Sequence, residues 1–416
     1  MRAIALSLAA ALSAGVVAAA ELPTTAPEAV GFSSERLQRI TDVFAADAKA
    51  GKIAGAVILV AREGKVAYLQ AIGQRDPKTS AAMAPDAIFR IYSMSKPITS
   101  LAIMMLMEEG KILLADPASK FLPALKGLKV GEEVTDGSGA KSLIQVAARR
   151  EMTIQDLLRH TSGLTYGVFG DSLVKAEYRK AGVGSRNDSN EQLVAKLATV
   201  PLAHQPGAVW DYSVSTDVLG RIVEVVSGMT LGAFVEQRIL SPLRMVDTGF
   251  HVPPAKHGRI AEPGADPATG TVPSLLDPRT PAKYESGGGG MVSTAADYFR
   301  LAQLFLDGGA LGVVRLVAPK TVALMTSDHV GAISRGPAYS PGPGYGFGLG
   351  FAVRTDPGLA AYPGTVGDYH WSGLGGTTFW IDPEERLVAI MMLQAPGQRL
   401  HYRQILRSLV YAALVN

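Results

Sequence analysis

The sequence predicts an α+β fold, in which strands from the two ends of the chain form one antiparallel sheet, flanked by helices, around an inserted and mostly helical region. Two β-rich stretches, residues 53–73 and 377–394, predict the sheet. Helical periodicity through much of the chain between them predicts the insertion.

Each β-rich stretch has the pattern of a hairpin. IAGAVILVAREGKVAYLQAIG, residues 53–73, has two strand-forming runs around a turn at Glu63 and Gly64. TTFWIDPEERLVAIMMLQ, residues 377–394, repeats the pattern with its turn at residues 382–385. We therefore expect the two hairpins to meet in one sheet.

The chain between the hairpins carries helical signals. IQDLLRH, STDVLGRIVEVVSG and GAFVEQRIL have apolar residues at a spacing near 3.6, with Gly163 and Gly228 placed as helix stops. The Gly and Pro clusters of residues 331–350 are typical of loops, not of a linker between independent domains.

A glycine run lies in GGGGMVSTAAD, residues 287–297. No Gly-Lys-Ser/Thr follows it, which argues against a nucleotide-binding loop. Thr294 followed by Asp297 instead fits the N-terminal cap of a helix.

Composition favours a small-molecule partner. The 416 residues are 47% hydrophobic, which can fill a large core, and 40 basic against 37 acidic residues give a net charge of +3. So small a charge is not the footprint of a nucleic-acid-binding protein. The chain has no cysteine, which excludes disulfides and thiolate metal sites.

The N-terminus predicts export. Residues 1–20, MRAIALSLAAALSAGVVAAA, combine Arg2, an apolar stretch and small residues before Glu21, as in a secretory signal peptide. Because the apolar run approaches spanning length, an N-terminal membrane anchor is the alternative. Cleavage after residue 20 would leave a periplasmic or secreted protein with no stable membrane span.

The chemistry that the sequence permits centres on FRIYSMSKPITSLAIMMLMEEG, residues 89–110. Ser93 and Lys96 are three residues apart, so on a helix their Cβ atoms would lie about 5–6 Å apart on one face. A lysine made neutral by burial or by a nearby cation can accept the proton of a serine and activate it as a nucleophile. The helix N-terminus offers backbone amides to a developing oxyanion. A serine cap beside a solvated lysine is the alternative.

Sequence context separates this pair from two others with the same spacing. Ser138 with Lys141 lies in a glycine-rich polar loop, and Ser172 with Lys175 opens a charged helix that we expect to face solvent. Only Ser93 precedes a helix that is apolar all round, and such a buried helix would hold a nucleophile rigidly at the floor of a cleft.

Two further stretches could complete this site. WDYSVSTDVLG, residues 210–220, places Tyr212 before a helix, where a phenol with cationic neighbours could act as a base, and a packed aromatic is the alternative. HWSGLGGTTFW, residues 370–380, places small residues at the start of a strand, where a backbone N–H could complete an oxyanion hole, and a tight turn is the alternative.

Other catalytic arrangements have less support. Gly-x-Ser-x-Gly is absent, which argues against the nucleophile elbow of α/β-hydrolases. His370 could assist the chemistry or be a strand-edge histidine, and His160 is expected to close the preceding helix. Seven histidines without a His-Glu-x-x-His pattern argue against catalytic zinc, and no cofactor is predicted.

Together these stretches resemble the serine hydrolases of the class C β-lactamase type and, among them, the family VIII carboxylesterases. The resemblance runs from about Phe32 to the last strand and includes LLRHTSGL (157–164), PGAVWDYS (206–213), SPLRMVDTGF (241–250) and GGGGMVST (287–294). Ser-x-x-Lys is a known signature of β-lactamases and penicillin-binding proteins. The resemblance implies a β-lactamase/transpeptidase-like fold.

The same resemblance implies roles for residues of this chain. Ser93 would be the acylated nucleophile, Lys96 its activating partner, and Tyr212 the proton acceptor that also orients the deacylating water. The backbone amides of Ser93 and Leu374 would form the oxyanion hole.

The resemblance also implies a division of the chain. Residues 21–95 and 285–416 would form the sheet domain, residues 96–284 the mostly helical domain, and the active site would lie in the cleft between them. TYGVFGDSLVKAEYRKAG, residues 165–182, resembles the segment that lines the alcohol side of that cleft, and a plain surface helix is the alternative.

The sequence departs from β-lactamases at two motifs. Residues 212–214 are Tyr-Ser-Val where Tyr-x-Asn is expected, and Trp371, Ser372 and Gly373 stand where Lys-Thr-Gly binds the antibiotic carboxylate. Loss of the amide and the ammonium removes hydrogen bonds and charge that hold a β-lactam, whereas Trp371 offers an apolar wall suited to an ester.

The sequence hypothesis is thus a serine carboxylesterase that hydrolyses small, short-acyl esters through an acyl-enzyme and needs no metal or cofactor. It leaves weak β-lactam hydrolysis open. The alternatives are a β-lactamase or D-alanyl-D-alanine carboxypeptidase and, outside enzymes, an inactive penicillin-recognising protein.

Overall fold

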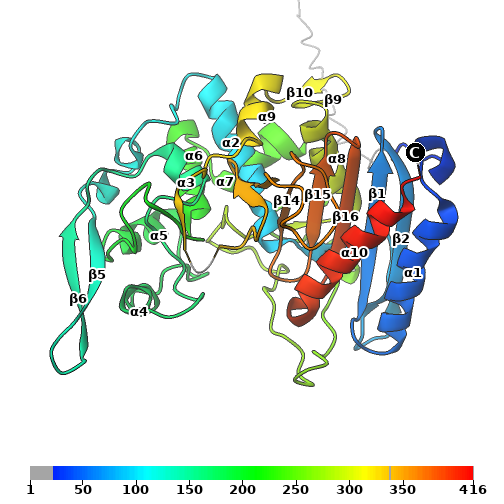
Figure 1. Ribbon diagram of the computed structural model, residues 1–416, viewed down its shortest axis with the longest axis horizontal. Helices are drawn as coiled ribbons and strands as arrows, with labels where there is room; N and C mark the ends of the chain where they lie inside the picture. The colour runs from blue at the N-terminus through cyan, green and yellow to red at the C-terminus, as the bar shows by residue number, and fades with distance from the viewer. Residues whose placement is uncertain (1–21, 337–338, 416) are drawn as a thin grey trace, which may run out of the picture.

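The central feature of the computed structural model, which describes residues 22–336 and 339–415, is an eight-stranded sheet (Figure 1). Its strand order is β12-β13-β14-β15-β16-β1-β2-β3, and all neighbouring strands are antiparallel. The first strand, β1 (Gly55–Arg62), pairs with the last, β16 (Leu387–Leu393). The two ends of the chain therefore meet in one sheet, which confirms the predicted α+β fold. The predicted signal peptide, residues 1–20, lies outside the described residues.

The other strands of this sheet are short or moderate in length. They are β2 (Lys65–Asp76), β3 (Ala81–Ala82), β12 (Tyr345–Phe347), β13 (Ala352–Arg354), β14 (Tyr369–Ser372) and β15 (Thr378–Asp382). Four small pairs lie outside it: β4 (Phe89–Arg90) with β8 (Val292–Ser293), β5 (Lys129–Thr135) with β6 (Lys141–Ala147), β7 (Val209–Trp210) with β11 (Ser334–Arg335), and β9 (Ala310–Leu311) with β10 (Val314–Arg315).

Helices cover both faces of the sheet and build the inserted region. They are α1 (Ser34–Lys49), α2 (Ser95–Glu108), α3 (Ile154–Leu158), α4 (Leu173–Lys180), α5 (Asn190–Leu197), α6 (Ser215–Ser227), α7 (Leu231–Val235), α8 (Ala295–Leu306), α9 (Pro319–Met325) and α10 (Arg399–Ala413). A π-helical turn, Glu236–Leu240, continues α7.

The two faces of β1 show how the core is divided. Val57 and Leu59 belong to the larger core, which includes buried residues of α2 and α8, whereas Ile58 and Val60 belong to a second core with α1 and α10. This alternation follows from the twofold repeat of side chains along a strand. The sheet is therefore buried on both faces, with α1 and α10 packed together on one of them (Figure 1).

Several local predictions are confirmed. Glu63 and Gly64 both have positive φ, of 52° and 72°, as a tight hairpin turn between β1 and β2 requires. Gly228, with φ of 72°, ends α6. The Thr294 side chain accepts a hydrogen bond from the Asp297 amide and caps α8.

Two local predictions are wrong, and one element was not predicted. Helix α3 ends at Leu158, and His160, with φ of 59°, follows that end, so Gly163 is not the stop. The stretch 331–350 is not all loop, because β12 is an edge strand too short to show alternation in sequence. The helical region also contains the unpredicted hairpin β5–β6, which projects from the body of the molecule (Figure 1).

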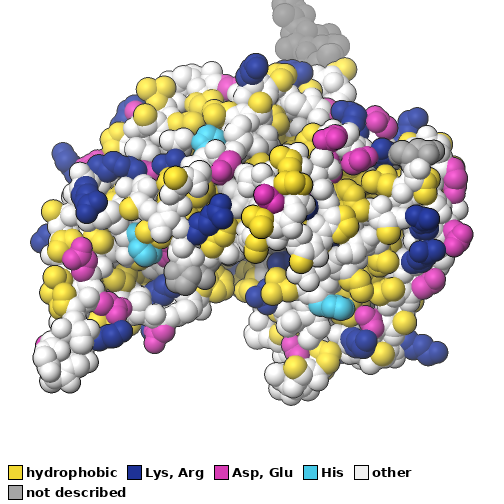
Figure 2. Space-filling model, in the orientation of Figure 1, with side chains coloured by type: hydrophobic (Ala, Val, Ile, Leu, Met, Phe, Trp, Pro, Cys, Tyr) yellow, Lys and Arg dark blue, Asp and Glu magenta, His cyan; other side chains and the backbone are white. Residues whose placement is uncertain are grey.

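The surface mixes charge with apolar side chains. On the face drawn in Figure 2, basic and acidic side chains are interspersed and hydrophobic ones are scattered between them. Within residues 22–336 and 339–415, no single helix is long and apolar enough to cross a membrane, although α6 and residues 231–240 pass that test together with a bend of 78°.

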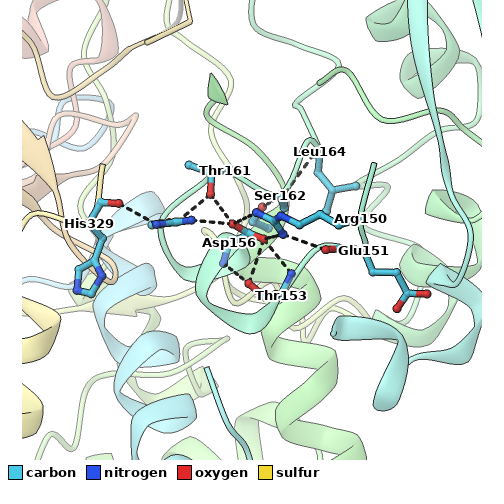
Figure 3. A network of polar contacts seen from close by, with 10 residues as sticks. Arg150, Glu151, Thr153, Asp156, Thr161, Ser162, Leu164 and His329 are labelled. Atoms are coloured by element: carbon cyan, nitrogen blue, oxygen red, sulfur yellow. Dashed lines mark hydrogen bonds and ion pairs between the residues drawn. The ribbon is translucent and has the colours of Figure 1, made fainter. Parts of the chain in front are cut away.

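The buried carboxylate of Asp156 is the centre of a network of polar contacts around α3 (Figure 3). Asp156, at the start of α3, accepts hydrogen bonds from the Thr153 amide and hydroxyl, both at 3.0 Å. It also pairs with Arg150 and with Arg159, the latter at 3.0 Å. Burial alone would raise the pKa of Asp156, but these hydrogen bonds and charges lower it to about 2.

This network fixes the segment that follows α3. The Thr161 hydroxyl donates to Asp156 at 2.9 Å, and the carbonyl of the neighbouring His160 accepts from the Asp211 amide at 3.0 Å. The backbone beside Tyr212 is therefore tied to the fully buried carboxylate of Asp156.

Replacing Asp156 with Asn should lower the free energy of unfolding by about 3 kcal/mol, because the two arginines lose a buried counter-charge. Since the folded pKa lies below the unfolded value of about 3.9, this stabilisation is present above about pH 4 and lost as the pH falls toward 2. Denaturant unfolding at pH 7 and about pH 3 measures both effects. The control is Asp171→Asn, at an exposed ion pair with Arg179, and an equal loss there would contradict the prediction.

Candidate active site

A strained turn presents Ser93 at the mouth of α2. Residues 92–94 form a 3-10 turn between β4 and α2, and Tyr92 has φ of 44°, a conformation that costs a non-glycine residue on the order of 1 kcal/mol. The Ser95 hydroxyl holds this turn, since it donates to the Tyr92 carbonyl at 2.7 Å and accepts from the Met291 amide at 3.1 Å. The turn is thus fixed from both sides.

Lys96 is fully buried and reaches three oxygen atoms. Its Nζ lies 3.3 Å from Ser93 Oγ, 3.2 Å from the Tyr166 hydroxyl and 2.7 Å from the Gly288 carbonyl. Among the described residues, no carboxylate forms an ion pair with it. An ammonium has three N–H donors, so these three acceptors match its hydrogen-bonding capacity.

Tyr212 completes the cluster. Its hydroxyl donates to Ser93 Oγ at 2.7 Å and accepts from Trp371 Nε1 at 3.3 Å. Lys96 Nζ lies 4.5 Å from the centre of the Tyr212 ring. The Ser93 hydroxyl therefore lies within hydrogen-bonding reach of both the amine and the phenol singled out in the sequence.

Aromatic side chains hold the Tyr212 ring in place. His160 packs edge-on at 4.9 Å and Trp210 stacks at 6.0 Å between ring centres. Burial and the charge of Lys96 lower the pKa of His160, so its imidazole is neutral. Its Nδ1 lies 3.2 Å from the hydroxyl of Ser213, the residue that follows Tyr212.

The loop after β14 brings a backbone amide toward the same place. Gly373 donates to the Thr377 carbonyl at 2.8 Å, and a Cβ atom on Gly373 would lie only 2.4 Å from the Ile91 carbonyl oxygen, so a larger residue does not fit. The Gly373 carbonyl accepts from Arg403. The Leu374 amide makes no hydrogen bond within the described chain.

One cavity of about 480 Å³ joins these groups. Its lining includes Ser93, Phe169, Tyr212, Trp371 and Leu374, together with Ser372 and Gly373. All the site residues predicted from sequence line this cavity except Lys96, which lies beneath it. Phe169 comes from the segment 165–182 that we expected at the cleft.

Three residues at this cluster were not predicted individually. Tyr166 and the Gly288 carbonyl contact Lys96, and Asp217 on α6 accepts from the Gly288 amide at 3.1 Å. A Cβ on Gly288 would lie 2.6 Å from an Asp217 oxygen. The glycine run was the available signal, because consecutive glycines allow a close approach of backbone. Burial and the charge of Asp217 raise the pKa of Tyr166, so its phenol is neutral.

The residues that the sequence set aside have local roles. Ser138 Oγ donates to Asp136 in the turn of the β5–β6 hairpin, and Ser172 Oγ accepts from the Lys175 amide at the start of α4. His370 in β14 is partly buried and packs edge-on against Tyr345, at 4.9 Å between ring centres. Burial, with nearby arginine charges, lowers its pKa.

The fold and this cluster can be set beside known proteins. A family model described as Beta-lactamase matches residues 40–412. Protein Rv1367c of Mycobacterium tuberculosis is 35% identical over 355 residues, which cover 83% of this chain and 86% of the relative. Esterase EstB of Burkholderia gladioli is 31% identical over 369 residues, with coverage of 83% and 86%.

A solved structure supports the same family assignment. The structure of EstCE1, described as a hydrolase with promiscuous acyltransferase activity, has a TM-score of 0.75 at 29% identity and covers 91% of this chain and 98% of its own. The chain therefore belongs to the beta-lactamase family and is a serine hydrolase of the esterase-like branch of that fold.

Proposed function

We propose that this protein is a carboxylesterase that hydrolyses small, short-acyl esters through an acyl-enzyme on Ser93. The observation that carries the proposal is the position of Ser93 Oγ, 3.3 Å from Lys96 Nζ and 2.7 Å from the Tyr212 hydroxyl. A nucleophile within reach of a base, which is itself oriented by a third group, is the arrangement that activates a serine.

In the proposed acylation, the reactive form pairs the Lys96 ammonium with the Tyr212 phenolate. Lys96 Nζ lies 4.5 Å from the centre of the ring, and the Trp371 N–H donates to the phenol oxygen at 3.3 Å, so both groups would stabilise negative charge on that oxygen during the reaction. Ser93 Oγ attacks the ester carbonyl carbon while its proton passes to Tyr212. The amides of Ser93 and Leu374 receive the oxyanion. Tyr212 then protonates the leaving alcohol, the carbon–oxygen bond breaks, and the acyl group remains on Ser93.

The proposed deacylation reverses the proton path. A water molecule enters the space left by the alcohol and gives one proton to Tyr212 while its oxygen bonds to the acyl carbon. The Ser93 oxygen then leaves and takes the proton back from Tyr212. The carboxylic acid departs, and the enzyme returns to its starting protonation state.

The groups around the cavity support an ester in preference to a β-lactam. Trp371 contributes a neutral N–H and an apolar face at the position where β-lactamases place a cationic lysine. Val214, at the position of the expected asparagine, is buried and has no side-chain amide to offer a β-lactam. The relative EstB, which is named as an esterase, supports the same substrate class.

Ser93→Ala should lower turnover of p-nitrophenyl acetate by roughly 10³-fold or more, because no acyl-enzyme can form. Steady-state kinetics and the intact mass of enzyme mixed with substrate give the two readouts. Ser172→Ala is the matched control, since it alters a serine with the same spacing to a lysine and should keep full activity. Unchanged turnover by Ser93→Ala would remove Ser93 from the mechanism.

Trp371→Phe should lower kcat/KM for the same ester by about tenfold, because it removes one hydrogen bond to the Tyr212 oxygen and keeps an aromatic ring. Trp210→Phe is the comparison, since the Nε1 of Trp210 has no partner within the described chain. Equal losses in the two variants would mean that aromatic packing, and not the hydrogen bond, supports catalysis.

Esters and β-lactams assayed on one preparation test the substrate class. We expect kcat/KM for p-nitrophenyl acetate to exceed that for nitrocefin by at least about tenfold, because the cavity lacks the lysine of the β-lactamase motif. A higher value for nitrocefin, or for a D-Ala-D-Ala peptide, would favour the β-lactamase or peptidase alternative.

A further inference from the structure

The cavity at Ser93 has a second part, which we call the arginine lobe and define by Arg399, Arg403, Arg407, His370 and Trp380. His370 and Trp380 are register partners on β14 and β15, and Trp380 belongs to the core shared with α1 and α10. The three arginines come from α10. The lobe therefore joins the outer face of the sheet, beneath α10, to the catalytic part of the cavity.

Four buried polar atoms of this lobe have neither a hydrogen bond nor an ion pair within the described chain. They are Arg403 Nε, Arg407 Nε, Trp380 Nε1 and His370 Nε2. Arginine and tryptophan nitrogens can only donate. Buried donors without acceptors are costly, each on the order of 1 kcal/mol or more, so a group rich in acceptors would be stabilised here.

The positive charge of the lobe is only partly balanced by carboxylates. Arg407 is paired with Asp368 at 2.7 Å, but no carboxylate of the described residues pairs with Arg399 or Arg403. The whole lining of the cavity contains no Asp or Glu. Burial lowers the pKa of Arg403 to about 9, and the charge of Arg399 adds to this decrease. A guanidinium in this position would gain from a bound anion.

A structural role accounts for only part of Arg403. One of its terminal N–H groups donates to the Gly373 carbonyl and so supports the loop that carries the Leu374 amide. A guanidinium has five N–H donors, and its Nε–H is not used by that contact. The side chain can therefore hold the loop and bind a ligand at the same time.

We propose that the arginine lobe binds a carboxylate carried by the ester substrate, with Arg403 as its main contact. The inference rests on the proposed esterase function and narrows it to esters with an acidic group on the acyl or the alcohol side. A carboxylate supplies acceptors for several donors at once and balances the arginine charge. A bound carboxylate would therefore account for both the unpaired buried donors and the unbalanced positive charge of the lobe.

Two matched pairs of esters test this proposal. One pair is the acetyl esters of 4-hydroxybenzoate and 4-hydroxybenzamide, with the charge on the alcohol side. The other is the p-nitrophenyl monoester of adipic acid and its methyl ester, with the charge on the acyl side. We expect kcat/KM to favour the acid in at least one pair, and Arg403→Gln to lower that preference roughly 10- to 100-fold.

Further variants separate ligand binding from support of the Gly373 loop. Loss of loop support alone would lower activity on the acid and the neutral ester by the same factor. Arg403→Lys, which keeps a charge, should retain part of the preference for the acid. Arg39→Gln, on the exposed face of α1, is the control for net charge and should leave the preference unchanged.

The wild-type protein provides a measurement that does not depend on folding of a variant. Benzoate or adipate should compete with p-nitrophenyl acetate, whereas benzamide should not, and the inhibition should weaken with salt. The proposal is overturned if neither pair shows a preference for the acid and neither acid competes, which would leave a solvent-filled lobe. In that case turnover of neutral esters through Ser93 would still stand, so the two proposals fail separately.

Discussion

Burial of Lys96 is the constraint on which the rest of the site depends. An ammonium taken out of water costs several kcal/mol unless each of its protons meets an acceptor. The three acceptors come from Ser93, Tyr166 and Gly288, which lie far apart in the sequence and belong to different parts of the fold. The three hydrogen bonds of Lys96 therefore hold together the start of α2, the loop after α3 and the glycine run before α8. The geometry around Ser93 is therefore set by a requirement of folding.

The same requirement explains the supporting structure. For its carbonyl to reach Lys96, the glycine run must lie close to α6, and Asp217 holds it there through the Gly288 amide. On the other side, the Asp156 ion pairs fix the backbone at His160, which is bonded to Asp211 next to Tyr212. Asp217 therefore fixes the glycine run on one side of the cluster, and Asp156 fixes the backbone near Tyr212 on the other. Both are buried: Asp156 is bonded to backbone, hydroxyl and arginine groups, and Asp217 to the Gly288 amide and the Ser286 hydroxyl, so each fixes the backbone beside the cluster.

Much of this arrangement could be predicted from sequence, and the features that could not be predicted were missed for identifiable physical reasons. The terminal hairpins, the apolar helix α2 and the cap at Thr294 are local patterns, and local patterns predict well. Ser93, Lys96 and Tyr212 were found from motif order. Tyr166, Asp217 and the Gly288 carbonyl were not, because their contacts with the cluster depend on long-range packing, and a backbone carbonyl leaves no trace in residue type. Strand β12 and the hairpin β5–β6 were missed because one is very short and the other is largely exposed.

The position of positive charge relative to Tyr212 links the proposed chemistry to the proposed substrate. At the position where β-lactamases place a lysine, Trp371 gives the phenol oxygen a neutral donor. The cationic groups of the cavity lie instead on α10, where Arg403 contacts the carbonyl of the same peptide whose N–H belongs to Leu374. A cation at that carbonyl polarises the peptide and strengthens its N–H as a donor. Under the two proposals, one guanidinium would therefore serve both the oxyanion and a substrate carboxylate, and α10 would couple recognition to turnover.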